Sequence, residues 1–209
     1  TEAGILWLNA AGNFGKASFT SNIAINTGNL QVKLPFRDNY VRLVVPADAV
    51  PVKIVLAWND FADDTGYRTP QDLDLVVEDK DGQEVAASRL LQNGGLGDNP
   101  DNRYSAHARE IIRTTLNAGT YYLKVPAKSV NFDPKSRLHI TVDGYGVKVL
   151  EQATEGVVLI PADNPQVLTV GASDVDYTSR RLAAGKPEVE VPSTLLFSNG
   201  VAIDGTSAA

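Results

Sequence analysis

The sequence contains no cysteine and no methionine, and only two of its 209 residues are histidine. The absence of cysteine excludes disulfide bonds, zinc–thiolate sites and cysteine nucleophiles. Stability therefore has to come from side-chain packing and from any bound ions. A mechanism that uses a histidine base has only His107 and His139 available.

The sequence also lacks long apolar runs and an excess of positive charge. A membrane helix needs roughly 18 to 20 apolar residues, and even the run from Val52 to Trp58 is interrupted by Lys53. Nineteen basic residues against 25 acidic ones give a net charge of −6, whereas nucleic-acid binding depends on positive charge. We expect neither nucleic acid nor a membrane as a partner. The 43% of hydrophobic residues is enough for a packed core and excludes a disordered chain.

The sequence pattern in the middle of the chain is typical of an antiparallel β-structure. Short β-branched and aromatic runs are separated by turn formers such as Asp79-Lys80-Asp81-Gly82. Eight such runs predict strands: Leu30–Leu34, Tyr40–Val45, Val52–Trp58, Leu73–Glu78, Gln83–Ala86, Arg109–Thr114, Thr120–Val125 and Leu138–Val142. Apolar and polar residues alternate in the last of them, as in strands with one face on a core. The pattern predicts a jelly-roll-like antiparallel β-sandwich over residues 25–152.

The two flanks have a different pattern of apolar residues. Gly4–Ala11 and Gln166–Ala172 are continuous apolar runs, which suit strands buried on both faces of a parallel sheet. We therefore expect a mainly β chain in which the sandwich is inserted between two partial α/β segments, residues 1–24 and 153–209. The alternative is a single irregular all-β domain. The start of the sequence is not typical of a leader peptide, and we expect a piece of a longer protein.

Two short motifs in the flanks carry catalytic chemistry. Asn13 follows the first apolar run in a turn of small residues, and Ser207 follows Gly205 and Thr206. An amide fixed at such a turn can donate to the negative oxygen that develops in acyl transfer. A serine hydroxyl there could attack a carbonyl, with its own backbone N–H as a second donor at a helix N-terminus. Each motif by itself is weak.

Together with two further segments in the same order, these motifs resemble the subtilisin-like serine proteases, the subtilases. The similar segments are Ala10-Ala11-Gly12-Asn13, Asn164 to Asp174, Lys186 to Ser193 and Gly205-Thr206-Ser207-Ala208-Ala209. The third segment departs from the family pattern at Glu188, Val191 and Ser193. The resemblance implies Ser207 as the nucleophile, Asn13 as an oxyanion donor, a protein or peptide substrate and no cofactor required for catalysis. We expect a secreted or cell-envelope location.

The resemblance also implies that catalytic parts are missing. In subtilases the histidine base and its orienting aspartate precede the asparagine, and neither lies upstream of Asn13. The family's aspartate motif is spelled by Asp64-Thr65-Gly66, but it follows Asn13 in a polar segment, and we interpret it as a turn. His107 and His139 have the sequence surroundings of ordinary surface or packing residues. A serine without a base is a poor nucleophile, so we expect the fragment alone to be inactive.

The inserted region resembles the jelly-roll β-domain found at the C-terminus of some alkaline subtilases. The resemblance rests on Val55–Asp60, Gln71–Val77 and Asn117–Val125, although here the domain stands before the nucleophile. As an alternative function, the sandwich could be a binding or stabilising module that recognises protein or glycan. We also expect the flanks to expose apolar faces, which a homodimer could cover.

Asp72 and Asp74 form the candidate metal site. They are two residues apart on one predicted strand, so their carboxylates are expected on the same face. Ca²⁺ takes six to eight oxygen ligands, and neighbouring loops could add more oxygens. The residues concerned are Asp60, Asp98, Asp101 and Asn102. The competing interpretation is a solvated acidic edge without a metal.

Overall fold

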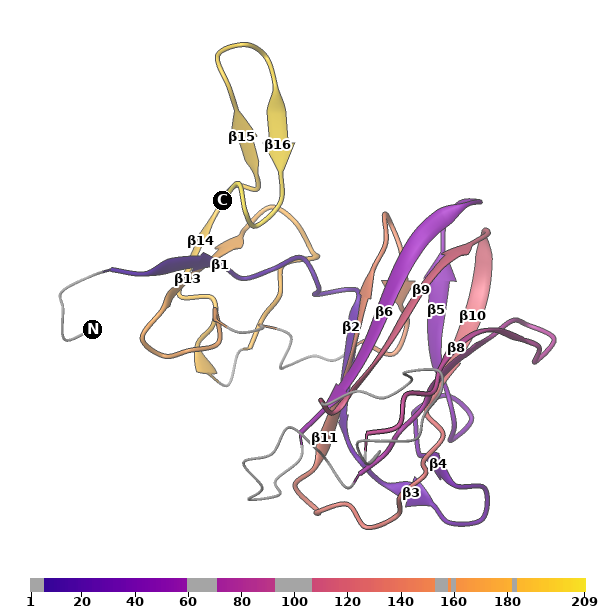
Figure 1. Ribbon diagram of the computed structural model, residues 1–209. Coiled ribbons are helices and arrows are strands. Elements are labelled where there is room, and N and C mark those ends of the chain that lie inside the picture. The colour runs from indigo at the N-terminus through magenta and orange to yellow at the C-terminus, as the bar shows by residue number, and fades with distance from the viewer. Residues whose placement is uncertain (1–5, 60–70, 93–106, 153–157, 159–160, 182–183) are drawn as a thin grey trace. The chain divides into compact units, whose positions relative to one another are not determined.

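A computed structural model describes residues 6–59, 71–92, 107–152, 158, 161–181 and 184–209. The chain divides into two compact units (Figure 1). Unit 1 comprises Thr1–Ser18 and Gln152–Ala209, and unit 2 comprises Phe19–Glu151. Every regular element among the described residues is a β-strand. Within the same residues no helix is long and apolar enough to cross a membrane.

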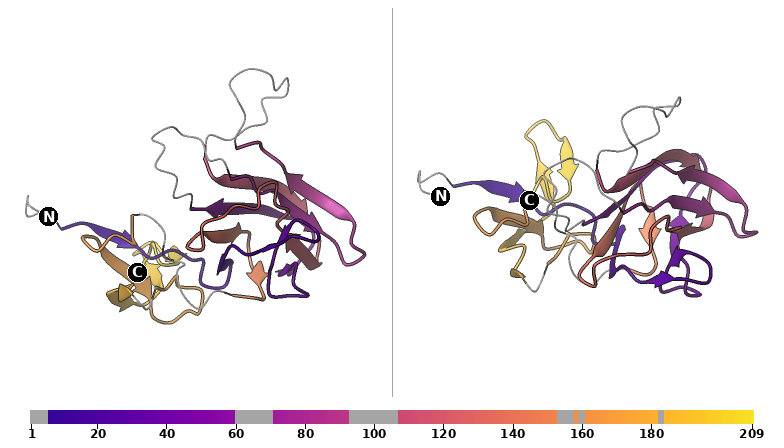
Figure 2. Two further views of the ribbon diagram at one scale, coloured as in Figure 1. Left: turned by 90° about the horizontal axis from the view of Figure 1, so that it is seen from below. Right: turned by 60° about the horizontal axis from the view of Figure 1, so that its bottom comes forward.

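Unit 2 is an antiparallel β-sandwich of a five-stranded and a four-stranded sheet, which lie against each other in the views of Figures 1 and 2. The five-stranded sheet has the order β12-β5-β10-β7-β8. Its strands are β12 (Lys148–Val149), β5 (Val41–Val45), β10 (Gly119–Lys124), β7 (Leu75–Glu78) and β8 (Glu84–Ser88). The four-stranded sheet has the order β2-β11-β6-β9. Its strands are β2 (Ser18–Asn22), β11 (Arg137–Asp143), β6 (Val50–Trp58) and β9 (Arg109–Leu116). A short pair, β3 (Ile25–Asn26) and β4 (Gln31–Val32), stands beside them.

The alternating sequence explains why these segments form strands of a sandwich. Along β6 the residues alternate between buried and more exposed positions, and β11 shows the same period of two. The inward residues Leu56 and Ile140 lie opposite each other in the register of β6 with β11, and both are fully buried. Burying a side chain of this size stabilises the fold by about 1.5–3 kcal/mol. The two inner faces together form the core of unit 2.

All eight predicted strands coincide with observed ones, and the mainly β fold with an antiparallel sandwich is confirmed. Within the sandwich, three short strands were not predicted: β2, β3 and β12. β2 has the polar sequence Ser-Phe-Thr-Ser-Asn, which shows little apolar patterning. β2 joins the four-stranded sheet, and the compact sandwich unit begins at Phe19.

Unit 1 contains a three-stranded parallel sheet with the order β1-β13-β14. The strands are β1 (Leu8–Ala10), β13 (Leu168–Ala172) and β14 (Val189–Val191), followed by a hairpin of β15 (Thr194–Leu196) and β16 (Ala202–Asp204). The two apolar runs of the flanks therefore pair with each other, in parallel. The expected burial on both faces is only partial in the described residues: β1 has no buried residue, whereas Thr169, Gly171 and Ala172 of β13 are buried.

Candidate active site

The carboxyl ends of the three parallel strands of unit 1 supply the residues of the candidate active site. Because β1, β13 and β14 run in the same direction, their carboxyl ends lie at one edge of the sheet. After β1, the N–H of Ala11 continues the ladder by donating to Val170 at 2.8 Å, and Gly12 then turns the chain with φ +95°. After β14, the carbonyl oxygen of Ser193 accepts from the N–H of Gly205 at 3.0 Å. The segments that carry Asn13 and Ser207 are therefore both anchored at this edge.

Asn13 and the motif around Ser207 are joined by hydrogen bonds through Thr206. The Asn13 Oδ1 atom accepts from the backbone N–H of Thr206 at 3.1 Å and from its hydroxyl at 3.0 Å. The N–H of Gly12 donates to the same hydroxyl oxygen at 3.1 Å. Thr206 is buried, whereas Asn13 and Ser207 are exposed. Residues 193 positions apart thus form one network, with the two candidate catalytic groups on its exposed side.

This network orients the side-chain amide of Asn13. Because Oδ1 accepts from two donors of Thr206, the carbonyl side of the amide faces the motif and the Nδ2 group points elsewhere. No described residue accepts a hydrogen bond from Nδ2, so its N–H groups can serve an incoming acceptor. Gly205 makes room for the amide: it has φ +126°, and an added Cβ would lie 3.1 Å from Nδ2.

A loop of residues 177–179 supports the turn that carries Asn13. The N–H of Ser179 donates to the Gly12 carbonyl at 2.8 Å, and the Ser179 hydroxyl accepts from the N–H of Phe14 at 3.0 Å. The N–H of Gly15 donates to the Tyr177 carbonyl at 2.8 Å. These bonds bracket Asn13 on both sides and hold its backbone in place.

Ser207 itself lies in a hydrogen-bonded turn. The N–H of Ala208 donates to the Gly205 carbonyl at 3.0 Å, and no described residue bonds the Ser207 side chain. Both histidines of the sequence, His107 and His139, belong to unit 2. The Nδ1 atom of His139 lies 2.6 Å from the Thr20 hydroxyl oxygen, and burial lowers the pKa of His139 to about 4.

The surroundings of the candidate metal site differ from the solvated acidic edge that was one interpretation of the sequence. Asp72 and Asp74 are both almost fully buried, which contradicts a solvated acidic edge. They precede β7, in a segment that pairs with residues 126–129: the Asp74 N–H donates to Pro126, and the Asp72 carbonyl accepts from the N–H of Lys128. This pairing draws both carboxylates below the surface.

The two carboxylates have unequal partners. The Asp74 Oδ2 atom lies 3.2 Å from the Lys128 Nζ atom and 4.0 Å from the Arg89 Nε atom. The Oδ1 atom of Asp72 is buried and has no hydrogen-bond partner in the described part of the chain. Burial, and then the charge of Asp74, raise the pKa of Asp72 to about 6, although Lys128 opposes the shift. Among the described residues, the Asp72 Oδ1 atom thus has no hydrogen-bond donor to offset its burial.

The described residues contain no cluster of three or more acidic or histidine side chains that could hold a metal ion. Asp72 and Asp74 supply two of the six to eight oxygen ligands that Ca²⁺ takes. The further candidates Asp60, Asp98, Asp101 and Asn102, and the turn Asp64-Thr65-Gly66, lie outside the described residues.

No protein-family model matches the sequence, and no curated protein matches it. Among solved structures, the chain is similar to the Clostridium perfringens CspB protease, with a TM-score of 0.54 and 13% identity. This match covers 98% of the chain and 46% of that protein, so the chain spans about half of its length. A pre-peptidase C-terminal domain of a Bacillus anthracis collagenase matches 66% of the chain and 97% of that domain, with a TM-score of 0.35 and 13% identity. At this identity the likeness to the protease concerns the fold alone: the chain has a β-rich fold similar to part of that protein.

The sequence did not reveal the residues that support the site. Thr206 stands within the quoted motif, but nothing in the sequence indicates that its hydroxyl holds Asn13. Ser179 lies 165 positions from Phe14, its hydrogen-bond partner, in a segment without apolar periodicity. Contacts of this kind depend on the pairing of β1 with β13 and leave no local signal.

Proposed function

We propose that the chain is part of a subtilisin-like serine endopeptidase, in which Ser207 is the nucleophile and Asn13 an oxyanion donor. The observation that carries the proposal is the pair of hydrogen bonds from Thr206 to the Asn13 Oδ1 atom. They join the two motifs, and the Nδ2 group of Asn13 has no acceptor among the described residues. The fold likeness to a chain titled a protease adds support.

In this reaction the Ser207 Oγ atom attacks the carbonyl carbon of a peptide bond, and a base removes its proton. The negative charge of the tetrahedral intermediate lies on the former carbonyl oxygen, where Asn13 and the backbone N–H of Ser207 donate hydrogen bonds. In subtilisin itself, loss of the asparagine donor lowers kcat by about 10² to 10³. The amide leaves as an amine, and water then releases the acyl group from Ser207.

The base and its orienting carboxylate are proposed to come from other parts of the parent enzyme. Both histidines of the chain belong to unit 2, and the pKa of His139 is lowered to about 4 by burial. The 209-residue chain is therefore inactive by this proposal, while the parent is active on proteins or peptides in a secreted or cell-envelope location. No cofactor takes part in the chemistry.

A fluorophosphonate probe tests the proposal, because it reacts only with an activated serine. We expect labelling of a longer parent protein, loss of labelling in its Ser207→Ala variant, and no labelling of the 209-residue chain. Ser198→Ala, at another exposed serine of unit 1, is the matched control and should keep the label. Labelling that survives Ser207→Ala would overturn the assignment of the nucleophile.

A structural Ca²⁺ ion at Asp72 and Asp74 is a second proposal, supported by the unpartnered Oδ1 atom of Asp72. A cation bound only by the folded state raises the melting temperature. We expect a chelator to lower the melting temperature of the chain and to leave that of the Asp72→Asn variant unchanged. Identical melting curves with calcium and with chelator would contradict the binding of Ca²⁺ at this site.

We also propose that unit 1 associates with a second copy of the chain through its exposed apolar side chains. Leu196 and Ile203 of the hairpin strands are exposed. Leu196→Lys with Ile203→Lys should lower the dimer fraction in sedimentation equilibrium, whereas Val85→Lys, an exposed position of unit 2, should not. A monomer at all concentrations would contradict this association.

As the alternative function, the sandwich acts as a binding or stabilising module for protein or glycan. Its compactness supports the idea, since the core of unit 2 is formed entirely within Phe19–Glu151. A module of this kind should fold and bind without the chemistry of Ser207.

A further inference from the structure

The outer face of the four-stranded sheet of unit 2 carries four cations. The period of two along β6, β9 and β11 turns alternate residues outward. These outward positions include Lys53, Arg109, Arg113 and Arg137, all of them exposed. Lys53 pairs in register with Arg113 on one side and with Asp143 on the other. Asp143 is the one acidic residue among the outward positions of these three described strands.

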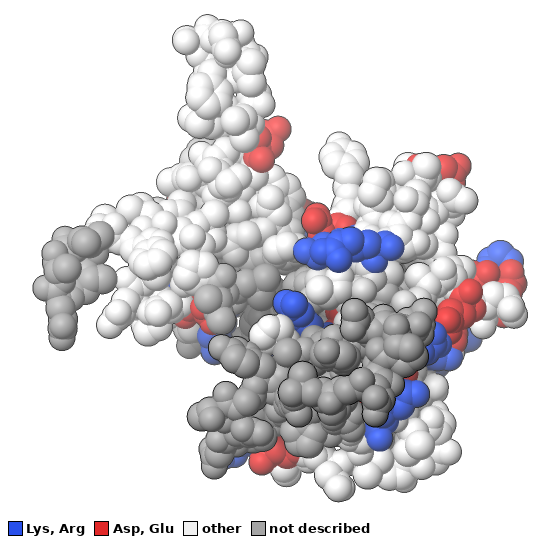
Figure 3. All heavy atoms as spheres, in the orientation of Figure 1, with Lys and Arg blue, Asp and Glu red and all other residues white. Residues whose placement is uncertain are grey.

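These four cations differ from those of the other sheet because they have no carboxylate partner among the described residues. On the five-stranded sheet, Arg42 bonds Glu151 at 2.6 Å and Lys124 pairs with Glu78. On the four-stranded sheet, no described acid forms an ion pair with Lys53 or Arg113. Figure 3 shows blue Lys and Arg atoms over β6, with a smaller group of red acidic atoms beside them. Like charges in neighbouring strands repel each other, so this face gains from an anion.

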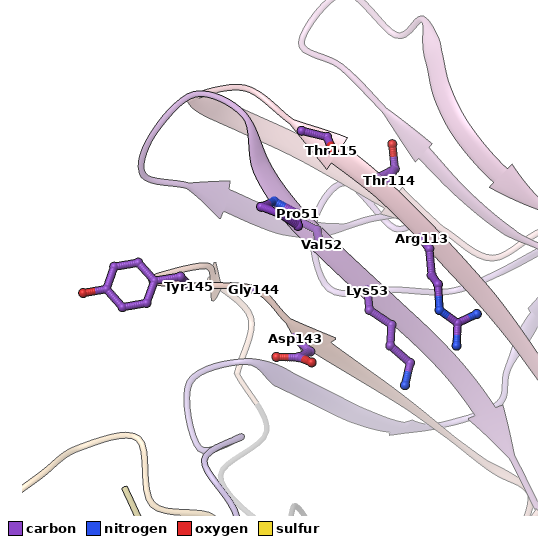
Figure 4. Close-up of a pocket in the computed structure, with 9 residues that line it drawn as sticks. All are labelled: Pro51, Val52, Lys53, Arg113, Thr114, Thr115, Asp143, Gly144 and Tyr145. Atoms are coloured by element: carbon purple, nitrogen blue, oxygen red, sulfur yellow. The ribbon is translucent and has the colours of Figure 1, made fainter. Parts of the chain in front are cut away.

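A shallow depression of about 600 Å³ lies at this face, where β6, β9 and the turn after β11 meet. Lys53, Arg113, Thr115 and Asp143 line it, together with Tyr145. In Figure 4 the side chains of Lys53 and Arg113 extend side by side from adjacent strands, the Asp143 carboxylate lies beside Lys53, and Tyr145 projects from the turn. Tyr145 is 94% exposed, so its ring is available to a ligand.

We propose that this depression binds a polysaccharide that carries isolated carboxylate groups, such as a uronic-acid polymer. One carboxylate of the polymer lies between Arg113 and Lys53; the guanidinium of Arg113 donates to both of its oxygens, as planar Arg groups do. A neighbouring sugar ring packs on Tyr145, which offers a broad apolar surface with a polar tip. The hydroxyl of Thr115 and the carboxylate of Asp143 bond sugar hydroxyl groups.

The charges around the depression favour widely spaced carboxylates over a dense polyanion. Asp143 repels a second anion close to Lys53, and the chain as a whole carries a net charge of −6. A densely charged polymer would meet this repulsion at every residue. An acidic polypeptide could pair with Lys53 and Arg113, but it gives Tyr145 and the hydroxyl of Thr115 no particular role. The proposal concerns unit 2 and does not depend on the proposed peptidase chemistry.

Binding of hyaluronate oligosaccharides to the 209-residue chain, measured by calorimetry, tests the proposal. Hyaluronate carries one carboxylate per disaccharide, and carboxyl-reduced hyaluronate is the neutral counterpart. We expect the double variant Lys53→Gln/Arg113→Gln to weaken binding by about tenfold or more, because it removes two charge-assisted contacts. The matched control is Lys33→Gln/Lys148→Gln, which removes the same charge at exposed positions elsewhere on unit 2 and should change binding less than about twofold.

Tyr145→Ala separates a glycan from an acidic peptide, since it should weaken binding of hyaluronate several-fold and leave binding of polyglutamate unchanged. Melting curves check that each variant folds. Three results would overturn the proposal: no binding of hyaluronate, equal binding of its carboxyl-reduced form, or equal losses in the two double variants. Polyglutamate binding that is as tight as that of hyaluronate, and insensitive to Tyr145→Ala, would assign the site to acidic polypeptides instead.

Discussion

Unit 2 and unit 1 bury their apolar side chains to very different extents. In unit 2, Leu56 and Ile140 are fully buried between two sheets. In unit 1, Trp7 is 55% exposed and Leu196 is 70% exposed. The sandwich thus covers its own apolar faces, whereas the described part of unit 1 leaves many of them in contact with solvent.

The difference follows from the type of sheet. Two antiparallel sheets stack and cover each other's inner face, and each strand needs only one apolar side. A parallel sheet is normally covered on both faces by further layers, and the described residues of unit 1 supply a sheet of three short strands. We infer that the sandwich is the more self-sufficient unit, and five predictions test this contrast from the largest expected effect to the smallest.

Equal truncations should have unequal costs in the two units. Leu56→Ala removes a fully buried side chain and should lower the free energy of unfolding by about 2–5 kcal/mol. Leu196→Ala, at an exposed position of β15, should change it by less than about 0.5 kcal/mol. Urea unfolding followed by the fluorescence of the buried Trp58 measures both. Equal losses of unfolding free energy in the two variants would contradict the inferred difference between the units.

Asp72 should make unit 2 less stable as the pH rises from about 4 to 6. Its pKa is raised from 3.8 to about 6, so the folded state binds the proton more tightly than the unfolded state does. The resulting stability is complete below the unfolded pKa and is lost as the pH rises through the folded one, at a cost of about 3 kcal/mol. Urea unfolding in chelator, with Asp72→Asn as the comparison, measures the loss.

His139 acts in the opposite direction over the same range. Its pKa is lowered from 6.5 to about 4, so its contribution is present above the unfolded pKa and is lost as the pH falls to about 4. Asp72→Asn should therefore leave a protein that loses stability toward acid, and His139→Gln one that loses stability toward neutral pH. A bound Ca²⁺ ion would cancel the Asp72 effect, since it favours the ionised carboxylate.

Gly205→Ala should strain the candidate active site. Gly205 has φ +126°, and an added Cβ would lie 3.1 Å from the Asn13 Nδ2 atom. We expect the free energy of unfolding of unit 1 to fall by about 1–3 kcal/mol. The fluorescence of Trp7, in a Trp58→Phe background, measures this loss. Gly200→Ala is the control: it also has a positive φ, but nothing lies within 4 Å of the added atom. An equal effect of both would show that the contact with Asn13 is unimportant.

Thr206→Val should have the smallest effect that is still measurable. It removes the hydroxyl that bonds Asn13 and Gly12, and it leaves the Gly12 N–H without its acceptor. The expected loss is about 1 kcal/mol. Thr194→Val removes the hydroxyl bond to Asp204 at an exposed position and should cost less than about 0.5 kcal/mol. The same Trp7 fluorescence assay compares the two variants.

The success of the strand predictions has a simple physical basis. Alternation along Leu138–Val142 and the turn formers between the runs are local properties, and they predicted which segments form strands, with ends that differ from the observed ones by up to two residues. β2 escaped prediction because its residues are mostly polar, and its place in the sheet depends on pairing with β11. The same limit applies to Asp72 and Asp74, whose burial follows from the pairing of their segment with residues 126–129.

The candidate site was predictable in part. Asn13 and Ser207 were selected by their motifs, and the structure places both beside Thr206. The sequence could not show that the Asn13 amide is held by Thr206, or that the turn around it rests on Ser179. A hydrogen bond across 193 positions exists only once β1, β13 and β14 are assembled.

By itself, the sequence determined the local properties of this protein: the period of two in the sandwich strands, the turns between them, the continuous apolar runs of the flanks and the residue types of the candidate site motifs. Only the tertiary structure decided which segments became partners, such as β1 with β13 and β6 with β11. The reason is that a pattern of side chains specifies which face of a strand is apolar, whereas the choice of partner depends on packing and hydrogen bonding between segments far apart in the chain.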